Sequence, residues 1–376
     1  MKQDTQSTFD FCNEMSNGLL EKYKNKYAEV VELLNKTKAV DKNVDTITYT
    51  QNLDETKDAL EKVVIMFDQL TEDDKFCYLA DECKEKFYEL AGQIYAMYAS
   101  NIVQPKFGDK ALEYYQKYQV FLQRYKLHEY VRNLSEISVF SFRPVSIYSI
   151  ADLANETITV SRPSRMNDPF DSLANIWKKT ENLKNITKEK GHEEIFAKSM
   201  DYFRIRSFVL PNKTENSVLK NIRMWSAYAD EHKGFCVKYK MYEGFIKRID
   251  TKNVIVRRLA PVKYVCDYPM PTSLTAIDSY EAYNMKHECW KYENEIRLLS
   301  YNTSTDNDFY PEPMGNDAEI EEVIFGLLCH KEHIETICNI LKDKKVNFFK
   351  MTTDLENDIY TLKKEKYNPT NCHRDR

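Results

Sequence analysis

The chain has 376 residues, of which 54 are Lys or Arg and 59 are Asp or Glu, so its formal net charge is −5 at pH 7. This length predicts two or three domains rather than one small core. The negative balance provides no global attraction for a polyanion such as DNA. Eight glycines are too few for a Gly-rich repeat, a long flexible linker or a phosphate-binding loop.

Two further features bear on location. No stretch reaches the roughly 18 apolar residues of a membrane span, and the opening MKQDTQSTFDF lacks the apolar core of a signal peptide. Nine cysteines without a repeated spacing are typical of thiols in a reducing compartment rather than of a disulfide framework. We therefore expect a cytoplasmic protein of bacterial type with no membrane partner.

Residues 1–134 are predicted to form an α-helical interaction or regulatory domain. Apolar side chains recur three and four positions apart from residue 8 onwards, and no alternating strand pattern interrupts them. We expect a third helix over about 81–100 and a fourth after Gly108-Asp109. The clearest helical repeats are Tyr23, Tyr27, Val30, Val31 and Leu34, then Leu60, Val63, Val64 and Phe67.

The third and fourth of these helices have a family resemblance. Tyr88, Ala91, Gly92 and Tyr95, followed by Gly-Asp-Lys-Ala-Leu-Glu-Tyr-Tyr, resemble one tetratricopeptide hairpin, in which small residues let two helices approach closely. The turn at 101–107 is longer than in that family, and an ordinary helical bundle explains the same residues. In either form, the helices are expected to contact a protein partner or a second copy of the chain.

From Glu136 the pattern changes, because short β-branched and aromatic runs alternate with turn residues. We predict an α+β domain over 135–364 that carries the chemistry, then a frayed tail at 365–376. The expected strands are 137–142, 157–161, 235–239, 254–258, 296–301, 320–325 and 346–351, and the expected helices are 181–203, 217–232 and 331–343.

Four segments of this half stand out by their order and spacing. They are RMNDPFD at 165–171, MWSAYADEHKGFC at 224–236, WKYENEIR at 290–297 and IEEVIFG at 320–326. Together they resemble a widespread bacterial family known as domain of unknown function 2971, over about residues 138–352. That resemblance implies no activity, so function has to be argued from the residues.

In the second segment, Trp225, Tyr228, Ala229 and His232 share one helical face, and Gly234 is placed to end the helix. The plainer interpretation is a core helix with a satisfied histidine, because aromatic stripes usually serve packing. The alternative is that Trp225, Tyr228 and His232 bind the planar group of a ligand by stacking or hydrogen bonding.

The third segment leads into a strand. Residues i and i+2 of a strand face the same side, so Glu293 and Glu295 are expected to project together. Neighbouring carboxylates raise each other's proton affinity, which suits acid–base work or the stabilisation of a cationic transition state. Arg297 is expected on the same face and could instead neutralise the two carboxylates. The plainer interpretation is a surface strand of alternating charge.

The first segment contains Asn167 and Asp168 immediately before a proline, a combination that forms turns. A structural role is the plainer interpretation. We also include both residues among the candidate ligand contacts, and Asp171 as a candidate site carboxylate.

Arg143 at the end of a first strand, Ser161 at the end of a second and the Glu293-x-Glu295 pair on a late strand resemble the site layout of ADP-ribosyltransferases. The resemblance implies a split sheet and NAD as the substrate. Arg143 would hold the phosphates and Ser161 would support the nicotinamide pocket. Glu295 would stabilise the ribosyl oxocarbenium while Glu293 activates the acceptor. Arg162-Pro163 stands where that family has a second hydroxyl residue.

Metal chemistry has weaker candidates. Cys329, His330, His333 and Cys338 are zinc-ligand types, but isoleucines at helical spacing make that stretch an ordinary amphipathic helix. Asp168, Asp171, Glu293 and Glu295 are hard ligands that a magnesium-dependent nuclease uses. We expect no resident metal.

The leading hypothesis is an effector or toxin-like enzyme, one setting for which is bacterial defence. It would cleave the nicotinamide bond of NAD and act on a protein or nucleic-acid acceptor. The alternatives are a ligand-sensing module without catalysis and the metal-dependent nuclease.

Overall fold

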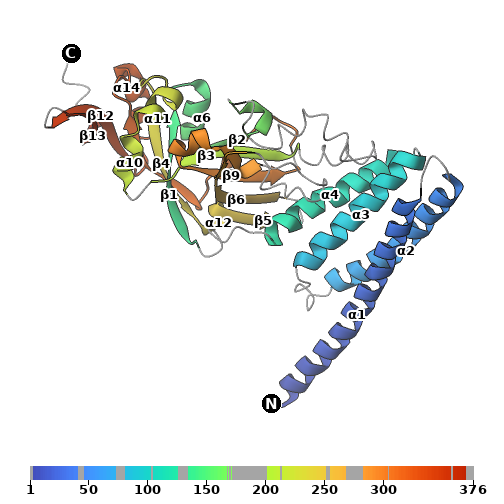
Figure 1. Cartoon of the computed structure of the whole chain (residues 1–376). Coiled ribbons are helices and arrows are strands. Elements are labelled where there is room, and N and C mark those ends of the chain that lie inside the picture. The colour runs from blue at the N-terminus through green and yellow to red at the C-terminus, as the bar shows by residue number, and fades with distance from the viewer. Residues whose placement is uncertain are drawn as a thin grey trace. The chain divides into compact units, whose positions relative to one another are not determined.

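The computed structural model describes most of the chain in two units (Figure 1). Helices α1 to α4 belong to one unit, and every described strand belongs to the other. No helix among the described residues is both long and apolar enough to cross a membrane. The described residues are 3–40, 46–72, 81–102, 105–125, 134–166, 168, 171, 201–211, 214–250, 255–267, 283–303, 305–356 and 359–369.

The helical unit consists of two packed pairs, α1 (Gln3–Ala39) with α2 (Thr46–Glu72) and α3 (Asp81–Ile102) with α4 (Pro105–Tyr125). The predicted apolar repeats supply its core, although Tyr27, Val31 and Val64 stay partly exposed. The buried members of those repeats are Tyr23, Val30, Leu34, Leu60, Val63 and Phe67.

In the second pair, Gly92 lies against the ring of Tyr115, and a Cβ at this position would lie only 2.8 Å from ring atoms. This is the close approach that the small residues predict. The fourth helix begins at Pro105, before the predicted start after Gly108-Asp109, because proline is favoured in the first turn of a helix. The tetratricopeptide resemblance stays a prediction.

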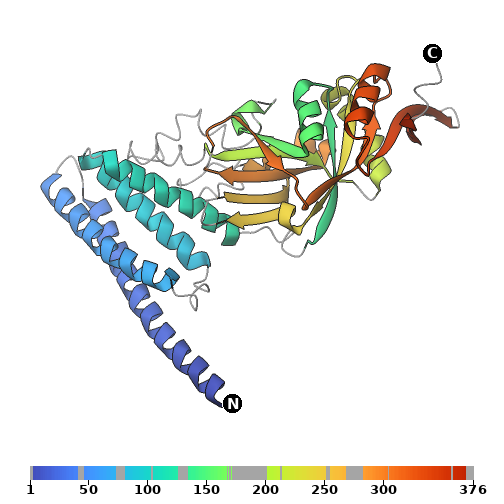
Figure 2. The same cartoon turned by 180° about the vertical axis from the view of Figure 1, so that it is seen from behind.

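The second unit is mixed α+β, which confirms the predicted fold class. Its strands form one 11-stranded sheet and a separate two-stranded sheet of β7 and β8 (Figure 2). The strands are β1 (Glu136–Arg143), β2 (Thr157–Ser161), β3 (Phe203–Val209), β4 (Phe235–Tyr242), β5 (Lys247–Asp250), β6 (Ile255–Pro261), β7 (Lys263–Val265), β8 (Met285–His287), β9 (Glu295–Asn302), β10 (Phe309–Pro313), β11 (Ala318–Phe325), β12 (Asn347–Glu356) and β13 (Ile359–Lys366). The helical segments are α6 (Ile147–Asn155), η2 (Pro163–Arg165), α10 (Glu215–Leu219), α11 (Ile222–Tyr228), α12 (Glu243–Ile246), η3 (Glu288–Glu293) and α14 (Lys331–Ile340).

The large sheet consists of two halves joined at one place. Its main path runs β13-β12-β11-β4-β1-β3-β9-β6-β5, and β2 with β10 branches from β3. β1 pairs with β4 along its whole length, and β3 pairs with β9 in the same way. Between β1 and β3, however, the single paired position is Phe140 with Val209. The two half-sheets therefore separate on leaving this junction.

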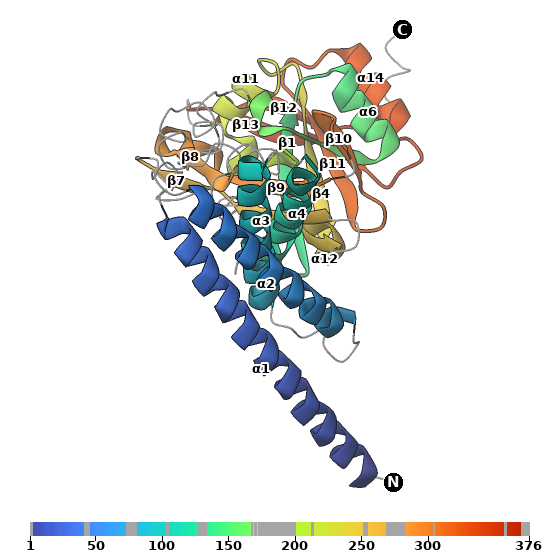
Figure 3. The ribbon, with the colours of Figure 1, turned by 90° about the vertical axis from the view of Figure 1, so that its right-hand side faces the viewer.

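Alternating side chains place a hydrophobic cluster on each face of the sheet. Val139, Val237 and Val323 belong to the cluster that α6 and α14 cover. Phe140 and Cys236, their neighbours in the chain, belong to the cluster that α11 covers. Figure 3 shows α6 and α14 next to each other, with α11 on the other side of the sheet.

Several predicted boundaries need correction. The helix expected over 181–203 is wrong at its end, because Phe203 begins β3, while residues 181–200 lie outside the described part of the chain. The helix expected over 217–232 is two short helices, α10 and α11. β13 pairs with β12 through Lys366, so the strand extends past residue 364, where fraying was expected.

Candidate functional site

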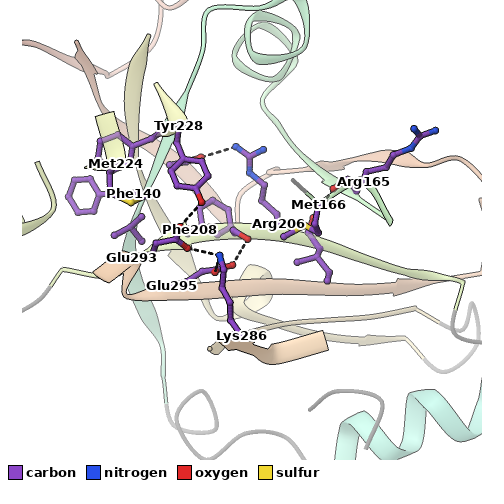
Figure 4. A pocket seen from close by; sticks show the side chains of 16 residues that line it. Phe140, Arg165, Met166, Arg206, Phe208, Met224, Tyr228, Lys286, Glu293 and Glu295 are labelled. Atoms are coloured by element: carbon purple, nitrogen blue, oxygen red, sulfur yellow. Dashed lines mark hydrogen bonds and ion pairs between the residues drawn. The ribbon is translucent and has the colours of Figure 1, made fainter. Parts of the chain in front are cut away.

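A cavity of about 220 Å³ lies where β1 and β3 separate (Figure 4). Residues of β1, β2, β3 and β9 line it, together with Tyr228 of α11, Lys286 of β8 and Glu293 of η3. The junction explains the cavity. Where β1 and β3 stop pairing they diverge, and no backbone ladder bridges the space between them. One end of this space is acidic and the other is basic.

At the acidic end, three carboxylates surround the ammonium group of Lys286. Its Nζ lies 2.6 Å from Oε2 of Glu293, 3.0 Å from Oε2 of Glu295 and 3.5 Å from Oδ2 of Asp171. All four side chains are at most 5% exposed. Glu293 ends η3 rather than lying on the strand, and Asn294 between the two glutamates has a left-handed φ of 45°. The predicted meeting of the two carboxylates thus occurs through a kink.

Arg297 completes this carboxylate cluster. It lies two residues after Glu295 on β9, on the same strand face, as the sequence predicts. Its Nε is 2.6 Å from Oε1 of Glu295, and its Nη2 donates to both oxygens of Asp171 at 2.7 and 2.8 Å. The hydroxyl of Ser207 also donates to Glu295. Both oxygens of Glu295 are therefore engaged by cations and a hydroxyl.

The pKa values of the two glutamates are shifted in opposite directions. Burial raises the pKa of Glu293, despite the nearby Lys286. For Glu295, burial also acts upward, but Arg297 and Lys286 lower the pKa to about 2. Burial opposes the charge on Lys286, yet the surrounding carboxylates raise its pKa. Neighbouring carboxylates whose environments push their pKa values apart are typical of catalytic sites, and Glu293 is the one whose affinity for a proton is raised.

At the basic end, Arg206 of β3 lines the cavity, and its Nη2 donates to Oγ of Ser141 at 2.7 Å. Its Nε is buried without a hydrogen-bond partner among the described residues. Burial, followed by repulsion from Arg143, lowers the pKa of Arg206 to about 10. Arg143 itself pairs with Asp152 at 2.7 Å. Two guanidiniums thus face one carboxylate, which leaves this end positive.

The wall beside the carboxylates is apolar and partly aromatic. Phe140, Phe142 and Met224 belong to the core cluster under α11, and all three line the cavity. The hydroxyl of Tyr228 donates to Oε1 of Glu293, which orients that carboxylate and places the phenol ring at the cavity. A planar apolar group can therefore lie next to Glu293.

The structure brings together four of the predicted site residues, since Ser161, Tyr228, Glu293 and Glu295 all line this cavity. Arg143 does not line it, and contributes only its charge behind Arg206. The backbone carbonyl of Asp168 accepts a hydrogen bond from the amide of Asp171 at 3.0 Å. Asn167 lies outside the described residues.

Trp225 lies in the core and His232 is half-buried beside it, and neither lines the cavity. Trp225 is completely buried, its Nε1 donates to the carbonyl of Leu219 at 2.8 Å, and its ring stacks on His232. Residues 230–232 all have left-handed φ angles, and the carbonyl of His232 lies where a Cβ on Gly326 would be 2.1 Å away. Gly234 has no such φ angle, and it is needed because a Cβ there would meet the carbonyl of Arg143 at 2.2 Å. The helix-stop interpretation of Gly234 is therefore wrong.

Sequence reasoning missed Lys286, Arg206 and Ser207. Lys286 lies on a three-residue strand with no periodic signal of its own. Arg206 and Ser207 lie on β3, which directly follows the segment predicted as a helix. Alternation in Phe203-Arg-Ile-Arg-Ser-Phe-Val209 is the signal that could have revealed this strand.

Metal chemistry has no prepared site here. Among the described residues no group of three or more His, Cys, Asp or Glu is arranged to hold a metal ion. Glu293 and Glu295 contact Lys286, and Asp171 contacts Lys286 and Arg297. In a magnesium-dependent nuclease these carboxylates would bind the metal ion instead. In the stretch considered for zinc, Ile334, Ile337 and Cys338 pack into the core from α14, as an amphipathic helix should.

The fold and cavity define an α+β protein with a cavity lined by buried carboxylates. Residues 224–298 match a family described as "Protein of unknown function (DUF2971)". This confirms the resemblance over a segment that includes α11, β4, Lys286 and both glutamates. No curated protein and no solved structure matches the chain. The ADP-ribosyltransferase resemblance stays a prediction.

Proposed function

We propose that this chain is an enzyme that breaks the bond between nicotinamide and ribose in NAD. The observation that carries the proposal is the separation of charge across one cavity, with Glu293 at the acidic end and Arg206 at the basic end. NAD has the complementary pattern, because its nicotinamide ring is cationic and its diphosphate is anionic.

The position of the cavity also supports the proposal. It lies at the junction of two half-sheets, and a split sheet is what the ADP-ribosyltransferase resemblance implies. The apolar wall of Phe140, Phe142 and Met224 offers a surface for the nicotinamide ring beside Glu293. Compared with the layout expected from sequence, Arg206 takes the place of Arg143, and Glu293 takes the reactive role from Glu295.

In the proposed reaction, the bond between ribose C1′ and the nicotinamide nitrogen breaks, and its electron pair leaves with nicotinamide as a neutral molecule. The ribosyl group becomes an oxocarbenium ion, which the Glu293 carboxylate stabilises. Water or an acceptor hydroxyl then adds to C1′, and its proton passes to Glu293. Glu295, Lys286 and Arg297 are positioning residues that hold Glu293 in place.

The experiment follows nicotinamide release from NAD by the purified full chain and by Glu293→Gln, with a chelator control. We expect release that Glu293→Gln lowers by about 10²- to 10⁴-fold, the usual contribution of an acid–base group, and that the chelator leaves unchanged. Mass spectrometry distinguishes transfer to a protein or nucleic-acid acceptor from simple hydrolysis. Full turnover by Glu293→Gln contradicts the mechanism, and chelator-sensitive activity favours a nuclease.

A further inference from the structure

An exposed pair of aromatic side chains lies beside the cavity. Tyr148 is 75% exposed and Phe309 is 51% exposed, yet their rings stack with centroids 6.3 Å apart and planes 21° from parallel. They are the two aromatic members of the large apolar side chains exposed among the described residues. The others are Ile47, Ile65, Ile147, Ile222, Leu328 and Leu355.

Strand pairing connects this aromatic pair to the cavity wall. Ser161 and Ile205 both line the cavity and pair with each other, and Phe309 pairs with Ser161 from the opposite side. Directly opposed residues of antiparallel strands project to the same side, and neighbouring strands lie about 4.8 Å apart. Phe309 is therefore one strand away from the wall of the cavity, on the side to which Ser161 projects.

The intervening rim is firmly built. Arg165 lines the cavity, and its Nε donates to Asp308, the residue before Phe309, at 2.8 Å. The amide of Arg162 donates to the carbonyl of Asp308 at 2.8 Å. A ligand that extends past Ser161 thus meets an ordered edge and then the two rings.

The cavity is too small for a whole dinucleotide. Its volume of about 220 Å³ lies below the roughly 300 Å³ at which pockets for drug-sized ligands begin, so it accommodates one ring and its sugar. If the proposed function holds, the diphosphate and the second nucleoside of NAD must leave the cavity over the rim. Arg165, which lines the cavity and pairs with Asp308 at the rim, places a positive charge along that path.

We propose that Tyr148 and Phe309 form a stacking platform for the adenine ring of the dinucleotide, so that the site selects nucleotides in which a diphosphate carries a second base. This inference rests on the proposed function for its choice of ligand. Stacking of a base on aromatic side chains contributes about 1–3 kcal/mol, which corresponds to roughly 5- to 150-fold in Kd.

The test is titration of the full chain with ADP, which has the adenine ring and the diphosphate but no nicotinamide. We expect Phe309→Ala and Tyr148→Ala each to weaken ADP binding by at least about fivefold, whereas Phe309→Trp retains it. Leu355→Ala is the matched control, since Leu355 is also 75% exposed but lies on β12. The platform is overturned if the wild-type chain does not bind ADP, or if both alanine variants bind ADP as tightly as the wild type does.

Nicotinamide mononucleotide, which lacks the second base, separates this inference from the proposed function. Cleavage of the mononucleotide that is unaffected by Phe309→Ala, together with weakened ADP binding, supports both proposals. Cleavage with unchanged ADP binding supports the enzyme and removes the platform. Weakened ADP binding without cleavage of either nucleotide supports the platform and removes the enzyme.

Discussion

Two buried clusters of charge in the mixed unit differ in balance. In the first, Arg257 of β6 pairs with Glu312 of β10 at 3.0 Å, and the hydroxyl of Ser300 donates to the same carboxylate. Its Nη2 donates to the carbonyl of Gly244 at 3.0 Å, while its Nε is buried without a hydrogen-bond partner among the described residues. One cation and one carboxylate neutralise each other, and neither lines the cavity at the sheet junction.

The carboxylate cluster at the cavity is built differently. Among the described residues, Asp171, Glu293 and Glu295 form ion pairs with Lys286 and Arg297, so three acidic groups face two cations. An uncompensated buried charge is costly, and the structure relieves it by raising the pKa of buried Glu293. The balanced cluster is thus neutral in itself, whereas the unbalanced one contains a carboxylate, Glu293, whose affinity for a proton is raised.

The largest expected effect comes from Arg297→Met, which leaves both Asp171 and Glu295 without their main partner. Breaking a buried ion pair costs about 3–5 kcal/mol, so urea unfolding followed by tryptophan fluorescence should show a loss of this size. Arg257→Met should lower the free energy of unfolding by a similar amount, because it leaves buried Glu312 without its cation.

A double replacement distinguishes the two clusters. Arg257→Met with Glu312→Leu removes a balanced pair and should recover most of the loss, since apolar replacements of buried pairs are often neutral. Arg297→Met with Glu295→Leu should not recover in the same way, because Asp171 stays unpaired by Arg297. Equal recovery in both clusters contradicts the distinction.

Lys286→Met should have an intermediate effect. It removes the ammonium from Glu293 and Glu295, although Arg297 still holds the latter, so we expect a loss of about 2–3 kcal/mol at pH 7. Without the lysine, the pKa of Glu293 rises further, and lowering the pH to 5 should restore part of the loss. Lys240→Met is the control, because its partner Glu136 is 56% exposed and such a pair contributes about 1 kcal/mol or less.

The pH dependence of stability offers a smaller effect. Because the folded-state pKa of Glu293 is raised, its contribution is fully present below about 4.5 and is lost as the pH rises through that pKa. Glu295, with a pKa of about 2, contributes above 4.5 and loses this as the pH falls. Glu293→Gln should therefore lose less stability than the wild type between pH 4.5 and 7. If the free energy of unfolding, measured in urea, changes equally with pH in the variant and the wild type, the pKa of Glu293 is not shifted.

The sequence predicts the parts of the site whose signal is local. Glu295 and Arg297 are two apart on a strand, so their shared face follows from strand geometry. Strands β4, β6, β9, β11 and β12 coincide with clear apolar runs, so they were also predictable. Lys286 lies only seven and nine residues before the glutamates, but it meets them because the 3-10 turn η3 folds the chain back between β8 and β9, which neither helix nor strand periodicity predicts.

The opposite error occurred where packing explains a motif that looked functional. Trp225 and His232 share helical spacing with Tyr228, yet of the three only Tyr228 lines the cavity. Trp225 is buried in the core cluster, and α11 ends at Tyr228, after which three left-handed residues redirect the chain at His232. The spacing of aromatic residues could not show where that helix ends. The aromatic spacing therefore marks a segment that reaches the cavity, but of its three candidate contacts only Tyr228 lies there.

The smallest expected effect is on activity, from Glu312→Gln in the balanced cluster. The amide oxygen of the introduced glutamine can still accept hydrogen bonds from Arg257 and Ser300, so we expect a stability loss of about 1–2 kcal/mol. Because Glu312 does not line the cavity, nicotinamide release per folded molecule should stay within about twofold of the wild type, against the 10²- to 10⁴-fold loss expected for Glu293→Gln. Both carboxylates are buried on the same unit, so a loss of release as large as that of Glu293→Gln would mean that burial of charge, rather than its place beside the cavity, controls the activity.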